Sequence, residues 1–344
     1  MARARLVRPG PLVTATLVIS ANAPDVDALA YVFGDSTDAL FYRRGWTHSL
    51  ITFLVQIPLL AGLVYAFGIR RAKGGADAPC WRSLLLASTL GYLSHIALDL
   101  LNTYGVRFLL PFDDRWVRGD MAFIVDPWMW LLFGSATLWG GEIRRRGYVL
   151  WFVLLGLGGL GMQFRHVPLP AIALWSTLMI LSAVLRRLRG TNVSLARASL
   201  LIVALYLSGL KAASCAARER GQAVITRHFN GDIEMESTVN PRPAIPWRSR
   251  VVVATPNTIF RVPVDLLQAA EEDQISHWFD RNLDDPALSQ IRETREYKTW
   301  KLFARHPFVL RDGDQIILGD GRYSYGTPES WGNLSLPFSP EPNL

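Results

Sequence analysis

Residues 81–101 read WRSLLLASTLGYLSHIALDLL, an apolar stretch with His95 and Asp99 near its end. About 20 predominantly apolar residues let an α-helix cross the hydrocarbon core of a bilayer, so this stretch predicts a membrane span. His95 and Asp99 are four positions apart and project from one face of such a helix on successive turns. Because ionisable side chains at membrane depth are costly and commonly mark functional sites, the chemistry is expected around this pair.

Apolar blocks fill the chain up to about residue 216, and 50% of its 344 residues are hydrophobic. Each clear block is long enough to span a bilayer, and residues 12–33 form a weaker candidate with a polar end. The clear blocks are residues 49–69, 81–101, 121–140, 148–164, 168–185 and 197–215. The sequence therefore predicts an all-α multi-pass membrane helical bundle of six to seven spans over residues 1–216, followed by a soluble α+β domain over residues 217–344.

Charge divides the chain along the same boundary. Residues 1–216 contain 21 Lys and Arg against 11 Asp and Glu, whereas residues 217–344 contain 15 against 18. The basic excess belongs to short loops between apolar blocks, as in the cytoplasmic loops of membrane proteins. The net charge of +7 is therefore explained by membrane topology, and no nucleic acid is expected as a partner.

The basic loops alternate along the predicted spans, which indicates how the chain is oriented. Basic residues concentrate at positions 3–8, 70–82, 144–146 and 186–197, on every second side of the spans. The positive-inside rule makes that side cytoplasmic. Seven spans then place the tail outside, together with residues 24–48 and 102–120, so the candidate functional groups gather on the outer face.

The tail has the pattern of a small α+β domain. Strand-like runs on either side of turn residues predict two hairpins, pairing residues 248–254 with 259–264 and residues 308–311 with 315–318. Asp285 followed by Pro286 predicts the start of a helix that runs to about Arg305. Residues 334–344 contain three prolines and are expected to be unstructured.

Asp25 and Asp27 lie in a PDVD segment at the edge of the first apolar stretch. Acids two positions apart on a turning backbone can offer one oxygen to a metal and another to a neighbouring ligand. The alternative interpretation is a solvated interfacial turn that caps a helix.

His48 lies in the segment RRGWTHS, directly before an apolar span. Its imidazole could bind a metal through one nitrogen while Thr47 or a backbone carbonyl orients the other nitrogen. The alternative is an interfacial histidine beside a tryptophan of the membrane belt.

The His95–Asp99 spacing lets both side chains meet one cation, or lets Asp99 orient His95 as an acceptor. The alternative is a buried hydrogen bond that holds helices together. Two histidines and three acids in all suit zinc or a similar divalent ion. Arg43 and Arg44 could hold an anionic phosphate by bidentate hydrogen bonds, or could bind lipid headgroups without catalysis.

The ordered motifs ANAPDVD, YRRGWTHS, LSHIALDLLNTYG, PFDDRW and FIVDPW resemble the YdjM-like family of bacterial inner-membrane metal-dependent hydrolases, some of which are under LexA control. The resemblance covers roughly residues 12–135. It implies a hydrolase at the bacterial inner membrane, with a motif order similar to that of zinc-dependent phospholipase C enzymes. At such a membrane, the topology given above predicts a periplasmic C-terminal domain.

On this resemblance the expected metal ligands are Asp25, Asp27, His48, His95 and Asp99. The chain departs from the family pattern in two places: it lacks the Thr-His segment that members often have on an earlier helix, and it has Arg43 where the family commonly has histidine. Two interpretations are open: either the site binds fewer metal ions, or the real start of the chain lies upstream of Met1. The expected function is a membrane-bound, metal-dependent hydrolase that activates water on a divalent metal, most simply zinc. The expected substrate is a phosphoester or a lipid-derived molecule in the bilayer. The alternative is a non-enzymatic transporter or envelope scaffold that uses the buried His–Asp pair for proton relay or helix packing.

Overall fold

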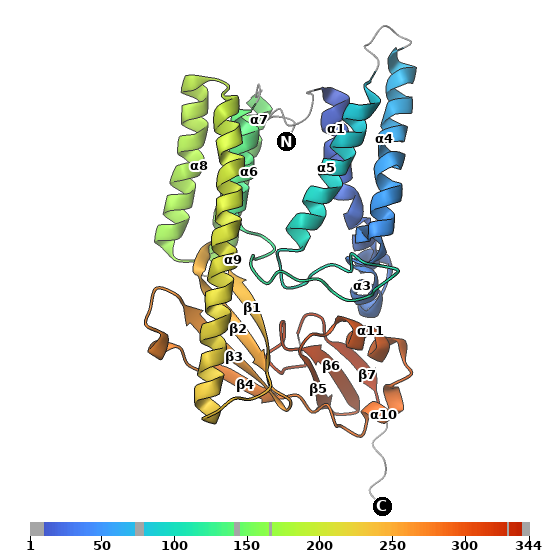
Figure 1. The fold of residues 1–344 in the computed structure, drawn as a ribbon, viewed down its shortest axis with the longest axis vertical. Coiled ribbons are helices and arrows are strands. Elements are labelled where there is room, and N and C mark those ends of the chain that lie inside the picture. Colours follow the sequence, from blue (N-terminus) through green and yellow to red (C-terminus); the bar gives the residue numbers. More distant parts are fainter. Residues whose placement is uncertain (1–9, 73–78, 141–144, 165–166, 329, 339–344) are drawn as a thin grey trace, which may run out of the picture.

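The computed structural model describes residues 10–72, 79–140, 145–164, 167–328 and 330–338. Its helices form two packed groups above a C-terminal region of antiparallel sheets (Figure 1). The first group contains α1 (Pro11–Asn22), α4 (Leu50–Ala72) and α5 (Trp81–Asp99). The second group contains α6 (Pro127–Trp139), α7 (Arg145–Phe164), α8 (Leu169–Arg189) and α9 (Val193–Phe229). The prediction of a helical N-terminal region and a partly sheet-like C-terminal region is confirmed.

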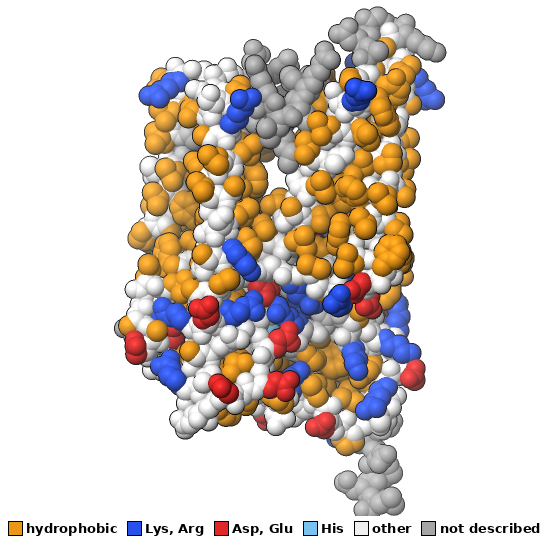
Figure 2. All heavy atoms as spheres, in the orientation of Figure 1, with side chains coloured by type: hydrophobic (Ala, Val, Ile, Leu, Met, Phe, Trp, Pro, Cys, Tyr) orange, Lys and Arg blue, Asp and Glu red, His pale blue; other side chains and the backbone are white. Residues whose placement is uncertain are grey.

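Among the described residues, α4, α8 and α9 are long and apolar enough to cross a membrane. The residues Gly147–Gln163 of α7 form a shorter apolar helix. Figure 2 shows apolar side chains over the outer surfaces of the helices, whereas acidic and basic side chains gather beneath them and over the sheets. This distribution is the one expected when the helices are solvated by lipid rather than by water.

The helix α6 begins later than predicted. The apolar block from residue 121 predicted a span to residue 140, but the structure has irregular chain before Pro127. The Asp126 carboxylate accepts hydrogen bonds from the backbone N–H groups of Trp128 and Met129, at 2.9 and 3.1 Å, and so caps the helix. A capping aspartate followed by proline at the first helical position sets this start despite the apolar residues before it.

Four short helical segments connect α1 to α4 beneath the first group. They are η1 (Ala23–Leu29), α2 (Ala30–Phe33), α3 (Ser36–Tyr42) and η2 (Trp46–His48). The weak apolar block at residues 12–33 is therefore an α-helix only as far as Asn22, and its polar end turns as a 3-10 helix at the foot of α1.

The C-terminal region contains two antiparallel sheets. The first consists, in spatial order, of β1 (Glu236–Arg242), β2 (Ile245–Ala254), β3 (Thr258–Asp265) and β4 (His277–Asp280). The second consists of β5 (Pro307–Asp312), β6 (Gln315–Asp320) and β7 (Leu334–Pro337). The pairing of β2 with β3 and of β5 with β6 confirms both predicted hairpins.

Two expectations for the C-terminal region are wrong. The helix expected from Asp285 to Arg305 is two helices, α10 (Leu288–Ile291) and α11 (Arg295–Phe303), because Thr294 caps a new start by accepting a bond from the Tyr297 N–H at 3.2 Å. The expected unstructured end contains β7, which pairs with β6 and buries Leu334 in the local core. Residues 339–344 lie outside the described residues.

Helix α9 runs unbroken past residue 216, where the sequence analysis drew the domain boundary. Ala217, Val224 and Ile225 on its C-terminal half pack into the core of the first sheet. At Gly221 the helix approaches β2 so closely that an added Cβ would lie 2.7 Å from the Val251 side chain. A single helix therefore belongs to both the helical region and the sheet region.

Candidate metal centre

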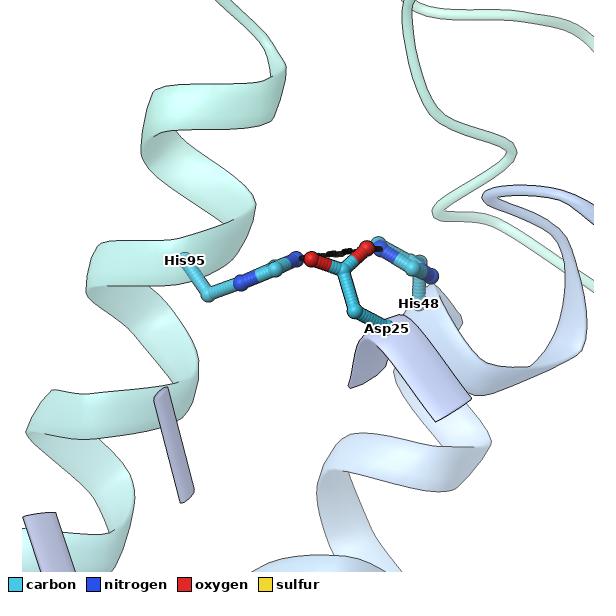
Figure 3. A group of neighbouring side chains, drawn as sticks. All are labelled: Asp25, His48 and His95. Atoms are coloured by element: carbon cyan, nitrogen blue, oxygen red, sulfur yellow. Dashed lines mark hydrogen bonds and ion pairs between the residues drawn. The ribbon is translucent and has the colours of Figure 1, made fainter. Parts of the chain in front are cut away.

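The side chains of Asp25, His48 and His95 converge at the foot of the first helix group (Figure 3). They come from η1, η2 and α5, and one ligand atom from each lies within 4.8 Å of the others. The two Nε2 atoms of His48 and His95 are 3.1 Å apart. Residues that are 23 to 70 positions apart in sequence are thus brought to one point, as the sequence analysis expected.

Both imidazoles are held by the nitrogen that faces away from this point. The Nδ1 atom of His95 lies 2.8 Å from the carbonyl oxygen of Ala21. The Nδ1 atom of His48 lies 2.9 Å from Thr47 Oγ1 and 3.1 Å from Asp27 Oδ2. Since these acceptors favour a proton on Nδ1, both Nε2 lone pairs are directed at each other, an arrangement that calls for a shared proton or a cation between them.

The carboxylate of Asp99 adds a third donor to the same point. Its Oδ2 atom lies 3.2 Å from His48 Nε2 and 3.4 Å from His95 Nε2. Two ligand atoms held at about 2.0–2.1 Å by one tetrahedral zinc ion are roughly 3.3 Å apart, which matches all three separations. Asp99 Oδ2 is also buried without a hydrogen-bond partner among the described residues. The donor set therefore fits a divalent cation.

Asp25 and Asp27 have different surroundings, although only one residue separates them. Asp25 Oδ1 is 4.0 Å from His48 Nε2 and 3.9 Å from His95 Nε2, and its side chain is 46% exposed. Asp27 is buried, and its oxygens accept from the Arg44 backbone N–H at 2.8 Å and from Thr47 Oγ1 at 2.7 Å. Asp25 thus lies on the open side of the cluster, whereas Asp27 contacts His48 on the nitrogen remote from it.

Electrostatics at this site favour positive charge. Burial opposes the charged form of His48, but its contacts with the carboxylates of Asp27 and Asp99 raise the pKa of His48 overall. Burial alone would raise the pKa of Asp27, but the contacts with His48, Arg43 and Thr47 hold it below its ordinary value. The carboxylates therefore stay ionised beside the imidazoles.

Arg43 and Arg44 are both engaged with the acids of the cluster. Arg43 Nη1 contacts Asp25 Oδ1 at 3.0 Å and also pairs with Asp27. Arg44 Nη2 pairs with Asp99 Oδ1 at 2.8 Å, which leaves Asp99 Oδ2 to face the histidines. Binding of a substrate by these arginines remains a prediction.

Asn102 is a supporting residue whose role the sequence analysis missed. Its Oδ1 accepts from Arg44 Nη1 at 2.9 Å and from the Tyr104 N–H at 2.9 Å. Gly105, at φ 82°, allows the turn, because an added Cβ would lie 2.5 Å from the Val117 carbonyl oxygen. The only signal in the sequence was the position of Asn102 just after the helix that bears Asp99.

Other acids on the same face do not join the cluster. Asp120 pairs with Arg305 and Arg218, at 2.6 and 3.0 Å. Asp126 caps α6 and accepts from the Tyr206 hydroxyl at 2.9 Å. These carboxylates have structural partners of their own.

Apolar helix surfaces and a polar cluster at one end of the helices define an integral membrane protein. Residues 1–168, just under half of the chain, match the model of the YdjM inner membrane protein family. The resemblance inferred from the motifs is therefore confirmed, and it places the protein among inner membrane proteins.

Two curated relatives are similar to the chain. It is 37% identical over 100 residues to the inner membrane protein YbcI of Escherichia coli (strain K12), covering 28% of this chain and 53% of YbcI. It is 28% identical over 151 residues to the uncharacterized protein YfhP of Bacillus subtilis (strain 168), covering 42% of this chain and 43% of YfhP. The chain thus spans about half the length of the curated relatives that it matches. No solved structure matches the chain.

Proposed function

We propose that this membrane protein is a metal-dependent hydrolase whose metal centre is the cluster of His48, His95 and Asp99, with Asp25 at its open side. The observation that carries the proposal is the set of three separations, 3.1, 3.2 and 3.4 Å, among the two Nε2 atoms and the buried Asp99 Oδ2, which has no hydrogen-bond partner in the part of the chain that the structure describes. Two nitrogens and one or two oxygens suit zinc. A divalent ion held there supplies Lewis acidity and lowers the pKa of a coordinated water toward neutrality.

The residues of the chain have separate tasks in this proposal. His48 and His95 present Nε2 to the ion, because their Nδ1 atoms are held by Asp27, Thr47 and the Ala21 carbonyl. Asp25 is half-exposed and can hold a proton from an incoming water at Oδ1. Arg43 lies beside Asp25 and can stabilise negative charge that develops on a phosphoester.

An apolar groove beside the cluster supports a lipid-derived substrate. The groove has a volume of about 420 Å³, and its wall includes Asp27 and Thr47, which contact His48 on Nδ1. The apolar part of its lining includes Val26, Leu29, Phe33, Tyr42 and Trp46. An acyl chain in this groove would place an adjoining ester or phosphoester near the histidines.

The orientation of the helices supports an outer-face site. His48 precedes the first turn of α4, and Arg70 and Arg71 lie in its last turn, so the cluster and the basic residues are at opposite ends of this helix. By the positive-inside rule the cluster and the sheets beneath it face the periplasm. The proposal includes the seven-span arrangement of the sequence analysis, with the C-terminal region on the periplasmic side.

Metal content of the purified protein tests the proposal. Wild-type protein in detergent is expected to contain about one divalent ion per chain by elemental analysis, and His95→Ala/Asp99→Ala to contain none. The matched control is His228→Ala/Asp232→Ala, which removes a pair with the same spacing far along the chain and is expected to retain the metal. Metal-free wild type, or equal content in the two double variants, would refute the centre.

Activity is tested next, on the metal-loaded wild type. A chromogenic phosphodiester and phospholipid vesicles are expected to be hydrolysed, with loss on chelation and recovery on addition of zinc. If the protein binds metal but hydrolyses neither class of ester, the proposed metal centre stands and the proposed hydrolase activity is refuted.

The direct contact of the His48 and His95 nitrogens, at 3.1 Å, favours a second candidate. Two imidazoles that share one proton beside Asp99 could relay protons in a transporter, or could simply hold the elements together in a scaffold. Flux into vesicles that depends on His95, in protein without bound metal, would establish this alternative.

A further inference from the structure

The segment of residues 100–126, which joins α5 to α6, lies between the helices and the sheets (Figure 1). The guanidinium of Arg322, from the chain after β6, contacts this segment. Its Nη1 atom donates to the Thr103 carbonyl oxygen at 2.6 Å. Its Nη2 atom donates to the Phe303 carbonyl oxygen at 2.9 Å and lies 2.7 Å from Asp320 Oδ2. Arg322 is 2% exposed, so these contacts are shielded from water.

A short series of polar contacts leads from Arg322 to the candidate metal centre. Thr103 follows Asn102, whose Oδ1 accepts from Arg44 Nη1 at 2.9 Å. Arg44 Nη2 in turn pairs with Asp99 Oδ1 at 2.8 Å. Asp99 Oδ2 is the oxygen that faces both histidines. Each contact fixes the group that makes the next one.

Contacts of other kinds hold the same segment against the C-terminal region. The Phe303 ring packs against Tyr104 and Trp116, with ring centroids 5.1 and 5.5 Å apart. Arg118 Nη2 donates to the Phe303 carbonyl oxygen at 3.0 Å. In addition, Arg295 of α11 pairs with Asp38 of α3, the helix that leads to Arg43 and Arg44. The C-terminal region therefore supports both chain segments that carry the cluster's arginines and Asp99.

We propose that Arg322 is a positioning residue of the metal centre and that the C-terminal region is a working part of the site. The inference rests on the proposed function. Arg322 Nε and Nη2 already satisfy Asp320, so the bond from Nη1 to Thr103 is not needed for that ion pair. Its effect is to fix the turn at Asn102 and, through Arg44, the oxygen of Asp99. The family match ends at residue 168, so this support comes from outside the matched part of the chain.

The test compares Arg322→Lys with Arg311→Lys in the full-length protein. Lysine at position 322 can keep a charge contact with Asp320 but cannot also reach both carbonyl oxygens. Arg311 makes a similar bidentate pair with Asp285, at 2.6 and 2.7 Å, within the same region and without contact to the segment. Zinc affinity is measured by competition with a chelating dye, and coordination geometry by the visible spectrum of the cobalt-substituted protein.

Arg322→Lys is expected to weaken zinc binding about 10- to 100-fold, as loss of a group that orients a ligand commonly does, and to change the cobalt spectrum. Arg322→Gln is expected to lose more zinc affinity than Arg322→Lys, because lysine keeps the positive charge beside Asp320. Arg311→Lys is expected to match wild type in both measurements. A cobalt spectrum altered in Arg322→Lys but not in Arg311→Lys distinguishes positioning from general loss of stability.

Folded Arg322→Lys with wild-type zinc affinity and spectrum would overturn the positioning role while leaving the proposed metal centre intact. Wild type without zinc affinity would overturn both. If Arg322→Lys does not fold, Trp331→Ala takes its place, because Trp331 is half-exposed and packs on Tyr104 and Tyr323 at 5.9 and 4.7 Å. Wild-type affinity in that variant would likewise refute the contribution of the C-terminal region.

Discussion

Two clusters of buried charge contact the segment of residues 100–126 or include part of it, and they differ in how their histidines are placed. In the candidate metal centre, His48 and His95 direct two Nε2 atoms at one point beside a carboxylate oxygen that has no hydrogen-bond partner within the described part of the chain. In the other cluster, here named the junction cluster and made of Asp120, Asp320, Arg305, Arg322 and His306, each carboxylate faces an arginine.

His306 of the junction cluster has no such partner nitrogen. Its Nε2 lies 2.8 Å from Thr238 Oγ1, and its Nδ1 is buried without a hydrogen-bond partner among the described residues. Buried ion pairs and at least one histidine are therefore common to both clusters. The candidate metal centre is distinguished by the Nε2 lone pairs of two histidines that point at one place. The junction cluster instead connects residues 100–126 with the C-terminal region through ion pairs.

The largest expected effect is on metal binding when one of the converging imidazoles is removed. His48→Ala is expected to abolish stoichiometric zinc, because it deletes a donor from the centre itself. His306→Gln is expected to leave zinc content unchanged in the folded protein. Elemental analysis of both variants checks this, and a loss of zinc in His306→Gln alone would reverse the assignment of the two clusters.

A smaller effect is expected from the residue that orients His48. Asp27→Asn keeps the size of the side chain but removes the charge that holds the Nδ1 proton, so zinc affinity is expected to fall about 10- to 100-fold. Competition with a chelating dye measures the change. The matched control is Asp35→Asn, an exposed acid in the same connection, which is expected to bind zinc as wild type does. Equal affinity in both would show that Asp27 is not needed to orient His48.

An effect of similar size, but without any change in metal binding, is a pH dependence of stability that arises in the junction cluster. Burial lowers the pKa of His306 from 6.5 to about 3 in the folded protein. The unfolded chain therefore takes up a proton below pH 6.5 that the folded chain does not, and stability falls as the pH falls from 6.5 toward 3. The expected loss is about 2 kcal/mol between pH 6.5 and about pH 4.5.

Thermal unfolding in detergent across this range checks the expectation. The comparison is between wild type and His306→Gln, which has no titrating imidazole and is expected to lose this part of the slope. Identical slopes in the two proteins would mean that His306 is not held neutral by the fold.

Much of the candidate metal centre could be predicted from the sequence, because its geometry depends on local periodicity. The spacing of His95 and Asp99 places them on one helix face, and the loops that carry Asp25 and His48 fall at the same end of their helices. The sequence analysis named Thr47 as a residue that could orient His48, and Thr47 Oγ1 lies 2.9 Å from His48 Nδ1.

The features that the sequence did not predict depend on contacts between residues that are far apart in the chain or on competing local signals. No local pattern distinguishes an arginine that pairs with acids from one free to bind phosphate, so the engagement of Arg43 and Arg44 was not predicted. The contact of Arg322 with Thr103 joins residues more than 200 positions apart. The break between α10 and α11 and the strand β7 were missed because capping by Thr294 and pairing with β6 outweighed the simpler local pattern.

The unbroken course of α9 has a mechanical consequence. At about 1.5 Å per residue, its 37 residues extend roughly 55 Å, well beyond the hydrocarbon thickness of about 30 Å. Because α9 is continuous, the sheets cannot turn freely relative to the part of the helix that lies in the bilayer. Each residue inserted into α9 would rotate the sheets about the helix axis by about 100°. The number of residues in α9 therefore determines which side of the sheet region contacts the ends of the other helices.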